Sequence, residues 1–300
     1  MRSKLKAAQT RLAARLRQLM LADAAAYLLI LLYAAFFSFL SIRRHLALQS
    51  YGYDLGIFDQ VIWNTAHGRW FLNTVMEDSP SFFGHHYAPL LALLAPLYWL
   101  WDSVNVILIA QSVALALGAA PVYWLARERL GGWAGVGFAA AYLLFPPLEA
   151  GNLFDFHEVA LAVPLLAFAL WFLVKKNNVG FAACAVLAMQ AKEDIPLSIA
   201  MMGLYALVVQ RRFKFGLGWI AASAVMFALA VYVIIPSAFQ GSAHPFLSYY
   251  SDFGQTPLQI AWSMVSNPAH TLRFLGPGRS LAYVWNLIAP FGLWPLLAPL

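Results

Sequence analysis

Residues 19–40 read LMLADAAAYLLILLYAAFFSFL, an apolar run that contains one charged residue, Asp23. About 20 consecutive apolar residues are enough to cross a bilayer as a helix, so this run predicts a transmembrane helix. A basic arm precedes the run, which is too long for the core of a signal peptide and lacks a small-residue cleavage site. We therefore expect a retained membrane anchor, with the arm before it in the cytoplasm.

Seven more apolar segments follow along the chain. The composition is 62% hydrophobic and 11% charged, whereas soluble domains carry roughly 25% charged residues. Together these features predict an all-α, polytopic transmembrane protein with about eight spans, which form a single domain over residues 1–300. The chain ends within the apolar run LIAPFGLWPLLAPL, which favours the N-terminal part of a longer protein. The predicted spans are residues 19–40, 104–125, 133–145, 159–174, 179–189, 195–209, 216–235 and 280–300.

The charged residues are sorted between the two sides that these spans define. Thirteen of the 19 Lys and Arg fall on the side of the N-terminus, which the positive-inside rule makes cytoplasmic. Eleven of the 13 carboxylates and all 7 histidines fall on the other side, although insertion does not require acidic residues there. We therefore expect the function on the outer face, and we expect the basic excess to meet lipid headgroups and not nucleic acid.

Two long loops, residues 41–101 and 236–279, lie on that outer side. Their aromatic and amphipathic stretches predict folded loops. Residues 87–101 (YAPLLALLAPLYWLW) contain two prolines and several interface-loving aromatics. A span there would move four basic residues of the later loops to the outer side. The charge bias therefore predicts an interfacial helix instead.

The first loop opens with an amphipathic helix that carries two carboxylates. Leu55, Phe58 and Ile62 recur at helical spacing, and Asp54 stands before them at a position typical of an N-cap. Asp54 and Asp59 are candidate catalytic groups. The alternative is that Asp54 only caps the helix and Asp59 only faces water.

Two further clusters each allow a functional and a purely structural interpretation. His85 and His86 stand before the interfacial segment, where they could bind an anion or serve as interfacial polar residues. Asp155, His157 and Glu158 link two spans and could ligate a divalent metal ion or relay protons. Alternatively, Asp155 and Glu158 form a capping box at the start of the next helix.

The sequence Gln190-Ala-Lys-Glu-Asp-Ile-Pro196 separates two short apolar segments. Ionisable groups near membrane depth usually face a cavity and pair with one another or with a ligand. Lys192, Glu193 and Asp194 are therefore candidate substrate-binding residues. The alternative is a solvated turn that needs only polar residues.

The runs YDLGIFDQVIWNTAHGRWF, GHHYAPLLALLAPLYWLW, NLFDFHE and QAKEDIPL resemble a family of uncharacterised prokaryotic membrane proteins over nearly the whole chain. The layout is more remotely similar to the GT-C superfamily of glycosyltransferases, such as the aminoarabinose and protein mannosyl transferases. Those enzymes keep a catalytic Asp just after the first helix, which corresponds to Asp54. Two motifs depart from that pattern, because His86 replaces a lysine and Glu193-Asp194 replaces a glycine.

The resemblance implies transfer of a sugar from a polyprenyl-phosphate donor at the outer face of the prokaryotic cytoplasmic membrane. Asp54 would be the base, and Asp59 would orient the acceptor or share its proton. Five further residues would hold a divalent metal ion or position Lys192, namely Asp155, His157, Glu158, Glu193 and Asp194. The donor phosphate would be bound by Lys192, His85, His86 and Arg69. An ion- or proton-coupled transporter and a non-catalytic scaffold are the alternatives.

Overall fold

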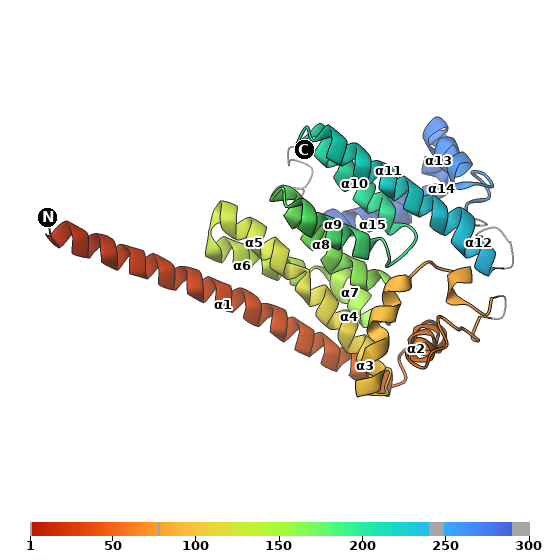
Figure 1. Ribbon diagram of the computed structural model, residues 1–300, viewed down its shortest axis with the longest axis horizontal. Coiled ribbons are helices and arrows are strands. Elements are labelled where there is room, and N and C mark those ends of the chain that lie inside the picture. Colours follow the sequence, from red (N-terminus) through yellow and green to blue (C-terminus); the bar gives the residue numbers. More distant parts are fainter. Residues whose placement is uncertain (1, 77–78, 240–248, 290–300) are drawn as a thin grey trace.

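A computed structural model describes residues 2–76, 79–239 and 249–289 (Figure 1). This part of the chain is helical, and its β structure is one isolated bridge between Leu72 and Ser81. The α-helices are α1 (Arg2–Leu46), α2 (Gly52–Ala66), α3 (Ala95–Leu100), α4 (Asn105–Leu117), α5 (Ala119–Leu130), α6 (Gly132–Leu143), α7 (Pro146–Phe154), α8 (Val159–Val174), α9 (Asn178–Ala188), α10 (Ile195–Val208), α11 (Phe213–Leu229), α12 (Ile235–Ala238), α13 (Pro257–Ser266), α14 (Pro268–Leu275) and α15 (Pro277–Ile288). The 3-10 helices η1 (Phe82–Gly84) and η2 (Pro89–Leu94) and the π-helical turn η3 (Ala230–Ile234) complete them. The predicted all-α class is confirmed.

Three helices of the described chain are long and apolar enough to cross a membrane. They are Leu19–Leu46, Asn105–Leu130 (α4 and α5) and Phe213–Ala238 (α11, η3 and α12). The predicted segments between them form apolar helices of 10–17 residues, and the predicted last span falls partly on residues outside the described ranges. The number of about eight spans therefore stays a prediction.

The consecutive helices α5 and α6, α8 and α9, and α10 and α11 pack as antiparallel pairs joined by short turns (Figure 1). Helix α1 packs on α4 and α6, and α8 also packs on α4. Small residues set the closest approach: a Cβ on Gly216 would lie 2.6 Å from the carbonyl oxygen of Gly203. Packing through small residues is how membrane helices approach each other, since lipid supplies no hydrophobic drive between them.

The first long loop folds into a cap over one end of the helices. Helix α2, η1, η2 and α3 bury their apolar faces with the start of α4, around residues such as Phe58, Phe82, Leu91 and Ile107. Helix α2 is the predicted amphipathic helix, and residues 87–101 form η2 and α3. The predicted N-cap is wrong, however. Helix α2 begins at Gly52, so Asp54 lies in its first turn and does not cap it.

The second long loop contributes α13 and α14. Both helices begin with a proline that follows a capping side chain, from Thr256 and Asn267. Each of these side chains accepts a hydrogen bond from a backbone N–H in the first turn, which is the usual N-cap arrangement. Residues 240–248 of this loop lie outside the described ranges.

Candidate functional site

The charged pairs of the helical domain gather at two separate ends of α8. At the end where α8 finishes, Lys175 pairs with Glu128, and Arg127 lies 2.9 Å from Asp23 nearby. At the end where α8 begins, Glu158 stands immediately before the first helical residue. The second end is covered by the loop that carries α2 and α3, and the candidate site lies there.

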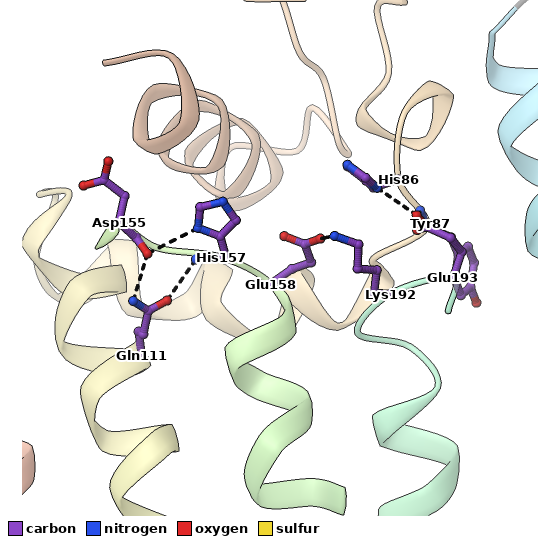
Figure 2. Close-up of polar contacts among 8 residues, drawn as sticks. All are labelled: His86, Tyr87, Gln111, Asp155, His157, Glu158, Lys192 and Glu193. Carbon is purple, nitrogen blue, oxygen red and sulfur yellow. Dashed lines mark hydrogen bonds and ion pairs between the residues drawn. The ribbon is translucent and has the colours of Figure 1, made fainter. Parts of the chain in front are cut away.

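Lys192 and Glu158 form the centre of this site (Figure 2). The Nζ atom of Lys192 lies 2.9 Å from Oε1 of Glu158, whose side chain is only 1% exposed. Burial alone would lower the pKa of Lys192, but the attraction of Glu158, with smaller contributions from Glu193 and Asp194, raises it above the ordinary value of 10.5. Lys192 is therefore a fixed cation, and 24% of its side chain remains exposed.

Glu193 holds the loop against the turn that carries Lys192. Its Oε1 atom lies 2.9 Å from Nδ1 of His86, and its Oε2 atom accepts a hydrogen bond of 3.1 Å from the backbone N–H of Tyr87 (Figure 2). A further hydrogen bond of 2.9 Å runs from the N–H of Leu90 to the carbonyl of Gln190. Residues 86–90 and 190–193 are thus joined side by side, and His86 lies beside the pair formed by Lys192.

Asp155 and His157 are positioned by Gln111, a residue that the sequence did not point to. The Gln111 side chain donates to the carbonyl of Asp155 (2.9 Å) and accepts from the N–H of His157 (2.9 Å). The Asp155 carboxylate instead accepts a hydrogen bond of 2.8 Å from the N–H of Tyr51, directly before α2. A glutamine within a predominantly apolar helix is the signal that could have revealed this link, since buried amides need partners.

The alternative interpretation of residues 155–158, a capping box, is wrong, because these contacts take its place. Glu158 stands at the N-cap position of α8 but makes no side-chain capping bond. The contacts also give no support to the hypothesis of a metal site at Asp155, His157 and Glu158. In the described chain, no three side chains of His, Cys, Asp or Glu gather as a group able to hold a metal ion. The carboxylates of Asp155 and Glu158 turn to different partners, the N–H of Tyr51 and Lys192.

The two candidate catalytic carboxylates lie on different faces of α2. They are five residues apart, which in an α-helix separates their directions by about 140°. Asp54 is half-buried and shares a face with Phe58, one turn later, whose ring lies 5.5 Å from that of His157. Asp59 instead accepts a hydrogen bond of 2.6 Å from Tyr98 and lines a separate cavity. Asp54 therefore lies on the face of α2 that is turned toward His157, and Asp59 does not.

The remaining candidates are dispersed. Arg69 is exposed, donates to the Asn64 side chain (2.9 Å) and has its guanidinium 5.0 Å from the ring centre of Trp63. His85 is buried, and its ring lies 5.6 Å from that of Phe239. Asp194 is exposed at the start of α10. The predicted set thus comes together at Lys192, Glu158, Glu193 and His86, while Arg69 lies outside it.

A comparison with protein-family models gives one match. The model described as "Predicted membrane protein (DUF2079)" covers residues 44–300, which includes every residue of the site. No curated protein matches the chain significantly, and no solved structure does.

Proposed function

The chain belongs to the DUF2079 family of predicted membrane proteins, and from its site we propose that it is a membrane glycosyltransferase. In this proposal it transfers a sugar from a polyprenyl-phosphate donor to an acceptor at the outer face of the membrane. The observation that supports this function best is the pair of Lys192 and Glu158, a fixed cation beneath the loop that carries Asp54.

Lys192 suits the phosphate of the donor. An ammonium group has three N–H donors, and Glu158 is the one ion-pair partner of Lys192 in the described chain. Donors therefore remain for phosphate oxygens on the exposed part of the side chain. As the bond between sugar and phosphate breaks, negative charge builds on the phosphate, and a prearranged cation stabilises that charge. His86 would lie beside the same phosphate, held in place by Glu193.

Asp54 suits the base of an inverting displacement. Its carboxylate would take the proton from the acceptor hydroxyl or amine while the acceptor atom bonds to the anomeric carbon. The bond from that carbon to the phosphate oxygen breaks at the same time, and the polyprenyl phosphate leaves with the electron pair. A base placed within hydrogen-bond reach typically contributes about 10²- to 10⁴-fold to the rate. The half-burial of Asp54, on the face of α2 toward His157, supports this role.

Binding of a polyprenyl monophosphate tests the phosphate site. Native mass spectrometry of the purified full chain should show retained lipid for the wild type and loss for Lys192→Ala. Lys175→Ala is the matched control, because Lys175 also pairs with a glutamate but at the other end of α8. The double variant Lys192→Met/Glu158→Gln removes the cation without leaving a buried carboxylate unpaired, and it should also lose the lipid.

Asp54→Asn separates binding from reaction. We expect this variant to retain the polyprenyl phosphate as the wild type does, and to lose sugar transfer from a polyprenyl-phosphate sugar. Wild-type protein that binds no polyprenyl phosphate while folded would contradict the proposal and favour the transporter alternative. Near wild-type transfer by Asp54→Asn would remove Asp54 from the role of base.

A further inference from the structure

A cavity of about 430 Å³ opens beside α2, on the face of the helix that carries Asp59. It lies where the end of α1 and the following linker meet α2 and the start of α4. Its lining residues are His45, Leu48, Ser50, Gly52, Leu55, Gly56, Asp59 and Val104. Tyr98, which hydrogen-bonds to Asp59, is followed by the exposed side chains of Trp99, Leu100 and Trp101. Exposed tryptophans are typical of the membrane interface, so the cavity opens at headgroup level.

Two glycines create the space in this cavity. Gly52 and Gly56 lie one helical turn apart, and Asp59 lies on the same face almost a turn later. A Cβ atom added at either glycine would meet no atom within 4 Å. No side chain of Gly52 or Gly56 therefore fills the cavity on this face of α2, and the Asp59 side chain lines it.

Asp59 lacks a cation. In the described chain its hydrogen-bond partner is the neutral Tyr98 hydroxyl, and no ion pair reaches it. His45 lines the same cavity, but its Nδ1 atom lies 3.2 Å from the hydroxyl of Ser50. Partial burial raises the pKa of Asp59, and the nearby charge of Asp102 raises it further, against opposing contributions from Tyr98 and His45. A half-buried carboxylate that forms no ion pair with a described residue favours a positively charged ligand.

We propose that this cavity binds a primary ammonium group, with Asp59 as the carboxylate that receives it. Among the described residues, no Phe, Tyr or Trp lines the cavity, whereas quaternary ammonium groups are recognised by aromatic cages. A primary ammonium instead needs hydrogen-bond acceptors, which Asp59 and the Ser50 hydroxyl supply. At headgroup level the group can belong to a soluble amine or to phosphatidylethanolamine. The site does not require the transfer reaction proposed above.

Two probes separate these sources. Ethanolamine, titrated by calorimetry into the purified full chain, reports a soluble amine. Phosphatidylethanolamine against phosphatidylcholine in mixed nanodiscs, with retained lipid counted by native mass spectrometry, reports a headgroup. Wild-type protein should bind at least one probe, and phosphatidylethanolamine should exceed phosphatidylcholine if the headgroup is the source. Binding of ethanolamine alone assigns a soluble amine.

Two variants assign the binding to the cavity. Asp59→Asn keeps an acceptor for Tyr98 but loses the charge, and should weaken the bound probe about tenfold or more. Gly56→Leu should fill the cavity and abolish binding. Gly137→Leu is the control, because Gly137 is likewise a helical glycine with open space around its Cβ position. All three variants should retain polyprenyl phosphate as the wild type does, since Lys192 is untouched.

Two results would contradict the proposal of an ammonium site in this cavity. One is a wild-type protein that neither binds ethanolamine nor prefers phosphatidylethanolamine over phosphatidylcholine. The other is binding that Asp59→Asn and Gly56→Leu leave at the level of Gly137→Leu.

Discussion

The ammonium of Lys192 lies 2.9 Å from Oε1 of Glu158, and this contact joins the turn before α10 to the residue that precedes α8. The other oxygen of Glu158 is buried and has no hydrogen-bond partner in the described chain. Removal of one member of a buried ion pair leaves the other charge without compensation, which commonly costs about 3–5 kcal/mol. Replacement of both members by uncharged groups avoids most of that cost.

Stability should therefore respond differently to the single and double variants. We expect Lys192→Ala to lower the free energy of unfolding by about 3 kcal/mol, and Lys192→Met/Glu158→Gln to lower it by less. Lys175→Ala breaks a more exposed pair and should cost about 1 kcal/mol at most. Denaturant titration in detergent checks these values. A double variant less stable than Lys192→Ala would show that the pair itself, and not an uncompensated Glu158, controls stability.

Glu193→Gln should loosen the loop while leaving the helices intact. The Glu193 carboxylate contacts Nδ1 of His86 and accepts a hydrogen bond from the N–H of Tyr87, and a neutral amide forms weaker hydrogen bonds than a carboxylate. Hydrogen exchange should become faster at Tyr87 and Leu90, by about tenfold, and stay unchanged in α8. Asp194→Asn, at the next position but exposed, is the control and should leave both amides protected. Equal protection in the two variants would contradict this role of Glu193.

Gln111→Leu should destabilise the start of α8. The substitution leaves the carbonyl of Asp155 and the N–H of His157 without their partner, at about 1–3 kcal/mol for each buried group. Gln111→Glu keeps the acceptor for His157 but places a buried carboxylate against the carbonyl of Asp155, so its loss of stability should be larger. Thermal unfolding of the three proteins in one detergent checks the order. If Gln111→Leu unfolds at the wild-type temperature, Gln111 does not hold this segment.

Asp59→Asn should stabilise the protein at neutral pH. The pKa of Asp59 is raised by burial above its ordinary value of 3.8, so the folded state binds the proton more tightly than the unfolded state. The stability from this group is present at low pH and is lost as the pH rises through the raised pKa. The variant should therefore unfold at a higher temperature than the wild type near pH 7, and the difference should vanish toward about pH 4. Asp252→Asn, at an exposed position, is the control and should unfold at the wild-type temperature at both pH values.

The same raised pKa gives a pH dependence to the proposed amine site. An ammonium group binds the ionised carboxylate, so the affinity for ethanolamine should rise as the pH increases through the pKa of Asp59 and then level off. Asp59→Asn should abolish that rise. Calorimetric titrations over a pH series check this expectation, and a wild-type affinity that falls as Asp59 ionises would contradict it.

Local patterns in the sequence predicted the local structure well. The spacing of Leu55, Phe58 and Ile62 predicted α2, and the long apolar run predicted the membrane part of α1, because both depend on residues close in the chain. The start of α2 was mispredicted. Asp54 looked like an N-cap, but Tyr51 takes that position, and its N–H is bound by Asp155 from a distant segment.

The partners of the site residues could not be predicted in the same way. Lys192, Glu158, Glu193 and His86 were all candidates, and one alternative had Glu158 positioning Lys192. Their actual pairing depends on how α8 and α10 pack, and the sequence carries no direct measure of that. The separation of Asp54 from Asp59 follows from helix geometry alone and was available beforehand. The role of Gln111 was missed because it connects segments far apart in the chain.

The length of α8 has a mechanical consequence for the surrounding lipid. Sixteen residues of helix measure about 24 Å, while the hydrocarbon core of a typical bilayer is about 30 Å thick. The ion pairs of Glu158 and Lys175 limit the apolar length to the helix between them. Tilting would only shorten the distance that this helix covers across the bilayer. If α8 is one of the spans, as the sequence predicts, a bilayer that meets both of its ends has to thin by several Å nearby, at a fraction of a kcal/mol for each Å. The protein should therefore be most stable in short-chain lipids and gather where a membrane is thin.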